Sequence, residues 1–230
     1  MQKLLLIDHP VSERRDRASA HLKAIGRDLT WCCPGRGETL PDPKGFEGLI
    51  VYGGAEMLST DLDQPDKAYL RQEVDYVAGW LASEKPFLGF CLGGQIMSLA
   101  LGGAVGPHPE GINQIGYYEI EATATGREFL PEPLAMYQWH QEGFSLPDGV
   151  DRIATGPDFP NQAIRRGKAY GLQFHPEVGA EQYRYWIQEV PDALTRPGAQ
   201  AAEEQLALAP ELDPITERWL DGFLDHWTRL

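Results

Sequence analysis

The hydrophobic residues of the first hundred positions fall into short apolar runs separated by stretches of helical periodicity. The apolar runs are typical of buried strands, whereas apolar residues recur three and four positions apart between 67 and 83, which predicts an amphipathic helix. Strands that alternate with helices in this way predict a mostly parallel α/β sheet. The strands are expected at 4–8, 29–33, 48–52 and 86–90, and the helices at 11–25, 67–83 and 95–101.

The pattern changes after Gly106, where short β-like runs follow one another with turns between them. We expect these runs to form hairpins or extra strands. The apolar run 170–174 is expected to return to the main sheet, and a helix is expected at 181–189. The β-like runs lie at 115–122, 134–139, 152–155 and 162–166.

The C-terminal region divides into two parts. Residues 196–214 are rich in Ala, Pro and Glu, and we expect a flexible or loosely packed connection there. Residues 215–230 predict an amphipathic helix that packs on its own domain, with a homodimer contact as the alternative. We therefore expect one domain over 1–195, followed by a linker and helix over 196–230. The apolar face of that helix carries Trp219, Leu220, Phe223, Leu224 and Trp227.

Composition and charge narrow the class of protein. The chain has 230 residues and a net charge of −14, which argues against binding to nucleic acid or to an anionic membrane surface, since both attract clustered Lys and Arg. The apolar run at the N-terminus is too short for a signal peptide or a membrane span. The three cysteines, Cys32, Cys33 and Cys91, do not form a disulfide framework, so we expect a cytoplasmic location.

The run 87–95 has the form of a nucleophile elbow with cysteine as the nucleophile. An apolar strand delivers Cys91 between Gly89 and Gly93, and a helix follows at once. Small flanking residues suit the tight turn, and the helix N-terminus favours a thiolate. A free cysteine is more often a small buried hydrophobe, but a core cysteine has no need of these glycines.

The run 173–177 supplies a base and a carboxylate. Pro176 favours an extended conformation at His175, and residues two apart on an extended segment point to the same side. Glu177 can therefore reach the imidazole of His175 and fix its tautomer and orientation, as the third member of a catalytic triad does.

Other residues near the predicted strand ends are weaker candidates for a functional role. Gly53 and Gly54 end a strand and can aim a backbone N–H at an oxyanion, and the N–H of Leu92 would be the second donor. A plain tight turn explains the glycine pair equally well. His140 could line a substrate pocket. The remaining histidines lack metal-ligand spacing, and the Cys32–Cys33 pair lacks the separation of a zinc site, so we expect no metal and no organic cofactor.

Together these motifs resemble those of class I, triad-type glutamine amidotransferases. The resemblance covers roughly residues 1–190 and rests on three landmarks in family order: the glycine pair 53–54, the elbow 89–95 and the His-Pro-Glu run 175–177. It implies a three-layer α/β/α sandwich with a flavodoxin-like core. An α/β-hydrolase would place its acid before its histidine, and a DJ-1-like protein has no His-Pro-Glu run, so both fit less well.

The family's chemistry implies roles for individual residues. Cys91 would attack the side-chain amide of glutamine to form a γ-glutamyl thioester, His175 would act as acid and base, and Glu177 would orient His175. The oxyanion would be held at Gly54 and Leu92. The substrate would be bound by Gly53, Gln95, His140, Gln141 and Glu142.

Within the family, the chain resembles the branch of stand-alone proteins that are similar to the glutaminase half of GMP synthase, through the runs 139–142 and 172–178. That branch usually has Asp at the position of Glu142, so recognition of the substrate's α-amine is expected to differ. No Ser-Gly-Gly-x-Asp-Ser phosphate loop occurs in the sequence, so we expect no ATP-using synthetase domain and no synthesis of GMP by this chain alone.

Three functional hypotheses remain open from the sequence. The chain is a glutaminase component that passes ammonia to a separate synthetase, or it is an independent hydrolase of γ-glutamyl compounds that resembles γ-glutamyl peptidases. The third is a non-catalytic binding module on the same fold. Copurification with a synthetase favours the first, hydrolysis of γ-glutamyl peptides by the lone chain favours the second, and unchanged biological activity of Cys91→Ala favours the third.

Overall fold

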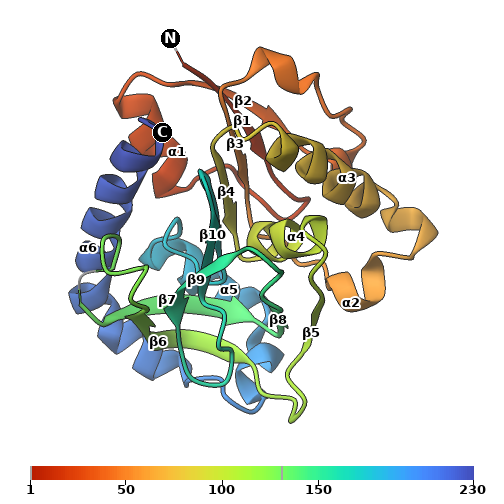
Figure 1. Ribbon diagram of the computed structural model, residues 1–230. Coiled ribbons are helices and arrows are strands. Elements are labelled where there is room, and N and C mark those ends of the chain that lie inside the picture. The colour runs from red at the N-terminus through yellow and green to blue at the C-terminus, as the bar shows by residue number, and fades with distance from the viewer. Residues whose placement is uncertain (1, 131) are drawn as a thin grey trace.

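A computed structural model describes residues 2–130 and 132–230, and its framework is a nine-stranded mixed sheet in the order β2-β1-β3-β4-β11-β10-β9-β6-β7 (Figure 1). A separate pair of short strands has the order β5-β8. The strands are β1 (Lys3–Ile7), β2 (Asp28–Cys32), β3 (Gly48–Val51), β4 (Phe87–Phe90), β5 (Val105–Pro107), β6 (Gln114–Ala122), β7 (Leu134–His140), β8 (Glu142–Phe144), β9 (Asp151–Thr155), β10 (Ala163–Arg166) and β11 (Ala169–Leu172). The α-helices are α1 (Arg17–Ala24), α2 (Leu58–Asp61), α3 (Tyr69–Ala82), α4 (Leu92–Ala100), α5 (Ala180–Glu189) and α6 (Ala202–Trp227).

Five strands form the parallel half of the main sheet. β2, β1, β3, β4 and β11 pair in parallel, whereas β10, β9, β6 and β7 extend the sheet through antiparallel pairs. Because parallel strands share one direction, the carboxyl ends of β3, β4 and β11 lie at the same edge, which is where open α/β sheets place their ligand sites. The predicted α/β class with mostly parallel core strands is confirmed.

The parallel half has a hydrophobic core on each face. Alternate β1 residues divide between the two cores: Leu4 and Leu6 pack in the core that α1 and α6 cover, and Leu5 and Ile7 pack in the core that α3 and α4 cover. Figure 1 shows α1 and α6 on one side of the sheet and α3 and α4 on the other. The α/β/α layering therefore follows from strands that are apolar on both sides.

The structure contradicts the expected loose connection at 196–214, because α6 already begins at Ala202 and contains Pro210 and Pro214. The first half of α6 is held by tertiary contacts. The buried amide of Gln205 accepts a hydrogen bond from the Tyr137 hydroxyl over 2.8 Å, and Ala209 packs in the core cluster of Tyr137. Packing and side-chain hydrogen bonds outweigh the low helix propensity of proline here.

The second half of α6 packs on the sheet of its own chain. Leu220, Leu224 and Trp227 are buried, and the Trp227 indole donates a hydrogen bond to the carbonyl of Phe87 over 3.1 Å. The domain boundary at residue 195 and the homodimer contact stay predictions. Within the described residues, 2–130 and 132–230, no helix has both the length and the apolar character that a membrane crossing needs.

Candidate active site

Cys91 occupies the tight turn between β4 and α4. Its backbone has φ 47° and ψ −103°, a region that residues with a side chain seldom adopt. Two hydrogen bonds hold this turn: the Cys91 N–H donates to the Leu172 carbonyl over 2.7 Å, and the Cys91 carbonyl accepts from the Gln95 N–H over 3.0 Å. The strained turn places the thiol at the N-terminus of α4, where the helix dipole favours negative charge.

The glycines around Cys91 permit close backbone contact between α4 and the strands beneath it. A Cβ atom at Gly89 would lie 2.3 Å from the carbonyl carbon of Gly93, and one at Gly93 would lie 2.1 Å from the carbonyl oxygen of Val51. At Gly94 a Cβ would lie 2.7 Å from the Leu172 carbonyl oxygen. Side chains at these positions would push α4 off β3, β4 and β11.

His175 and Glu177 follow β11 and contact each other. The Nδ1 atom of His175 lies 2.8 Å from Oε1 of Glu177, and the two side chains are 6% and 4% exposed. The His175 N–H donates to the Tyr137 carbonyl over 2.8 Å, which fixes the backbone of this segment. Burial alone would lower the pKa of His175, but the neighbouring Glu177 and Cys91 groups raise this pKa to about 10.

Gly53 brings the turn after β3 against both Cys91 and His175. A Cβ atom at Gly53 would lie 2.8 Å from Cε1 of His175 and 3.6 Å from the Cβ of Cys91. The structure thus gathers Cys91, His175 and Glu177 beside Gly53, although these residues lie far apart in the sequence.

The two expected oxyanion donors lie beside this cluster. A Cβ atom at Gly54 would lie 2.8 Å from Cδ2 of Leu92, so the two residues are in contact. Between described residues, no hydrogen bond uses the backbone N–H of Gly54 or of Leu92. Neither N–H group is therefore committed to an acceptor among the described residues.

Three of the expected substrate-binding residues form a buried group next to the cluster. The Gln95 amide donates to the Glu142 carbonyl over 3.0 Å, and Nδ1 of His140 lies 3.0 Å from the same oxygen. The Glu142 carboxylate faces the N–H of Ser59 in α2 over 3.3 Å. Burial and the neighbouring His175 lower the pKa of His140 to about 3, so its ring is neutral at neutral pH. Gln141 is partly exposed and, among the described residues, has no hydrogen-bond partner for its side chain.

The sequence model of the family described as glutamine amidotransferase class-I matches residues 36–188. The chain belongs to the class-I glutamine amidotransferase family. The chain is 30% identical over 188 residues to the glutamine amidotransferase-like protein YfeJ of Salmonella typhimurium, a match that covers 77% of this chain and 78% of that protein. It is 31% identical over 157 residues to a glutamine-hydrolyzing GMP synthase subunit of Archaeoglobus fulgidus, which covers 63% of this chain and 76% of that protein.

Solved structures agree with this membership. The crystal structure of a glutamine amidotransferase from Thermotoga maritima matches the amidotransferase with a TM-score of 0.86 and 28% identity, over 100% of this chain and 99% of that chain. A glutamine amidotransferase from Methylobacillus flagellatus matches with a TM-score of 0.89 and 25% identity, over 100% of this chain and 95% of that chain. The expected family and its fold are confirmed.

The side chain of Gln173 contacts the Cys91 sulfur, although the sequence analysis assigned it no role. Nε2 of Gln173 lies 3.6 Å from Sγ of Cys91, and the Gln173 side chain is buried. The signal was present, since Gln173 stands two residues before His175 on an extended segment and so shares its side. The Gln173 amide can donate a hydrogen bond to a negatively charged sulfur.

A role for Arg17 was not predicted either, because only the fold brings this residue to the site. It begins α1, and its Nε donates to the Pro176 carbonyl over 2.8 Å, while its backbone N–H donates to the Glu177 carbonyl over 3.0 Å. Its guanidinium also donates to the carbonyls of Val178 and Asp213. Arg17 therefore ties the segment that carries Glu177 to α1 and α6.

We expect Arg17→Met to lower the free energy of unfolding of the chain by about 2 kcal/mol or more, because the carbonyls of Pro176, Val178 and Asp213 lose a charged donor. Urea denaturation measures this loss. Arg15→Met is the matched control, since Arg15 is exposed and should change stability by no more than about 0.5 kcal/mol. Equal stability of the two variants would show that the Arg17 contacts contribute nothing.

Proposed function

We propose that this amidotransferase hydrolyses a γ-glutamyl amide through a thioester on Cys91. The Cys91 thiol gives its proton to His175 as its sulfur bonds to the γ-carbonyl carbon, the C–N bond breaks, and His175 passes that proton to the departing ammonia or amine. Water, deprotonated by His175, then attacks the same carbon, and the C–S bond breaks to release glutamate. The observation that supports this most is that the His175–Glu177 pair and Cys91 lie against the same glycine, Gly53, with the His175 ring within hydrogen-bond reach of the Cys91 thiol.

The surrounding groups suit the other needs of this reaction. The free N–H groups of Gly54 and Leu92 would stabilise the oxyanion of the tetrahedral intermediate. The buried Glu142 carboxylate would bind the α-amine of the substrate. Gln95 and His140 hold the backbone of Glu142 in place through its carbonyl, and Gly53 and Gln141 would complete the pocket.

Mass spectrometry after incubation with glutamine and a panel of γ-glutamyl peptides tests this proposal. We expect an adduct of one glutamyl group on Cys91, since the thioester forms before water attacks. Cys91→Ala should show no adduct. A wild-type chain that forms neither adduct nor glutamate with any member of the panel would contradict the proposal.

Two forms of this function differ in whether a partner takes the ammonia. The similarity to proteins named as glutamine-hydrolyzing GMP synthase subunits supports a glutaminase that delivers ammonia to a separate synthetase. The second form is an enzyme that acts on γ-glutamyl compounds without such a partner, through the same cluster of Cys91, His175 and Glu177. Glutamate release by the lone chain with γ-glutamyl peptides supports the second form, whereas activity that rises only with a copurifying synthetase supports the first.

A further inference from the structure

A buried histidine and glutamate lie behind the glycine turn of the site. His9 follows β1 closely, and Glu73 lies on α3; both side chains are fully buried. Nε2 of His9 is 3.1 Å from the Glu73 carboxylate, and Nδ1 of His9 is 3.1 Å from the carbonyl oxygen of Gly53. The mechanism proposed above uses neither residue.

The partners of the ring determine its protonation. A backbone carbonyl only accepts hydrogen bonds, so Nδ1 of His9 must carry a proton, and Nε2 faces a carboxylate. Burial lowers the pKa of His9, but Glu73, Glu56 and the Gly53 carbonyl together raise this pKa to about 9. A buried ion pair adds little stability compared with apolar side chains, so stability alone does not account for the pair.

That group is the peptide between Gly53 and Gly54. In a trans peptide the C=O and the following N–H point in opposite directions, so the Gly54 N–H points away from His9. A Cβ atom at Gly54 would lie 2.8 Å from Cγ of His9 and 2.8 Å from Cδ2 of Leu92. The peptide therefore lies between the His9 ring and the turn whose own N–H is the second oxyanion donor.

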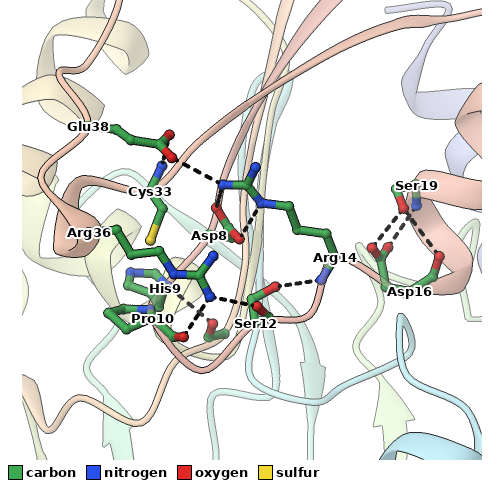
Figure 2. Close-up of polar contacts among 11 residues, drawn as sticks. Asp8, His9, Pro10, Ser12, Arg14, Asp16, Ser19, Cys33, Arg36 and Glu38 are labelled. Carbon is green, nitrogen blue, oxygen red and sulfur yellow. Dashed lines mark hydrogen bonds and ion pairs between the residues drawn. The ribbon is translucent and has the colours of Figure 1, made fainter.

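The segment that carries His9 is itself held firmly (Figure 2). The Asp8 carboxylate accepts two hydrogen bonds from Arg14 over 2.9 and 3.1 Å, so it does not compete for His9. Arg36 donates to the carbonyls of Pro10 and Ser12 over 2.8 and 2.9 Å. The His9 ring thus has a fixed position from which to hold the Gly53 carbonyl.

We infer that His9 is a positioning residue for oxyanion stabilisation. Its ring donates to the Gly53 carbonyl, turns the Gly54 N–H toward the oxygen that becomes negative when Cys91 attacks, and polarises that N–H through the shared peptide. Glu73 holds the His9 ring from behind. This inference rests on the proposed function, because the oxyanion exists only in that reaction.

The test compares two substitutions of similar shape. Asn in place of His9 keeps a donor at the position of Nδ1, whereas Leu does not, and both lose the contact with Glu73. With L-glutamine and L-γ-glutamyl-p-nitroanilide as probes, we expect His9→Leu to lower kcat roughly 10- to 100-fold with little change in KM, and His9→Asn to stay within about fivefold of wild type. His21→Asn removes a comparable histidine that pairs with Asp221 and Asp225 away from the site, and should leave kcat unchanged.

Alkylation of Cys91 by iodoacetamide separates positioning from general damage, because this displacement develops no oxyanion. We expect equal alkylation rates in wild type and both His9 variants. Equal kcat of His9→Leu and His9→Asn, or a parallel fall in alkylation, overturns the inference and leaves the proposed function standing. A wild-type chain that hydrolyses neither probe overturns the proposed function and the inference with it. If the single variants do not fold, the same comparison is made with Glu73→Met added, which removes the buried carboxylate that loses its partner when His9 is replaced.

Discussion

Replacing Cys91 with serine is expected to lower kcat for γ-glutamyl hydrolysis by roughly 10³-fold or more. Serine and cysteine differ in nucleophilicity, because sulfur attacks a carbonyl carbon far more readily than a hydroxyl oxygen does. Serine is close to cysteine in size, so the strained turn at φ 47° and its hydrogen bond to Leu172 should persist. Steady-state kinetics with L-glutamine and γ-glutamyl peptides measures the loss.

Cys32→Ser is the matched control for this substitution. Cys32 is also a buried free cysteine, and its thiol contacts the Thr39 carbonyl over 3.6 Å, a hydrogen bond that serine can make as well. We expect wild-type turnover from Cys32→Ser. Near-normal turnover by Cys91→Ser would refute the covalent role of Cys91, whereas a similar loss in both variants would indicate general damage to the fold.

The third hypothesis, a non-catalytic binding module, makes the opposite prediction at the same position. Cys91→Ala would then keep full biological activity, because binding needs no nucleophile. The buried His175–Glu177 pair favours the enzymatic hypotheses, since a module that only binds has no use for an imidazole held against a nucleophile elbow.

The grouping expected around Cys91 and the strands of the parallel sheet could be predicted from short stretches of sequence. The glycines around Cys91 and the Pro-spaced pair His175 and Glu177 each reveal their geometry within a few residues, because a tight turn needs small side chains and an extended segment puts alternate side chains on one side. The strands of the parallel half could also be predicted locally, because each appears in the sequence as a short apolar run with clear ends.

Features that depend on distant contacts could not be predicted. The stretch 202–214 is helical because Gln205 bonds to Tyr137 and Ala209 packs beside it, whereas its prolines alone indicated a connection. Arg17 reaches the carbonyl of Pro176 from the other end of the chain. The pairing of β5 with β8 likewise joins segments that carry no local sign of each other.

Removing the His175 ring is expected to cost more than neutralising Glu177. His175→Ala loses both the base that activates Cys91 and the acid that protonates the departing amine, and we expect kcat to fall roughly 10³-fold or more. Glu177→Gln keeps the ring and an oxygen near Nδ1, so its kcat should fall less. The opposite ranking, measured under one set of conditions, would contradict the assigned roles.

The same pair of variants predicts a change in pH dependence. In the wild type, burial lowers the pKa of His175, but Glu177 and Cys91 raise it to about 10, so the ring keeps the proton that the departing amine needs until the pH approaches that value. Glu177→Gln removes the largest raising influence and leaves the effect of burial, so the pKa falls and the alkaline limb of the kcat/KM profile moves to lower pH. NMR titration of His175 in Cys91→Ala, with and without Glu177→Gln, measures the effect of the carboxylate on the ring directly. An alkaline limb that does not move would show that Glu177 does not set the protonation of His175.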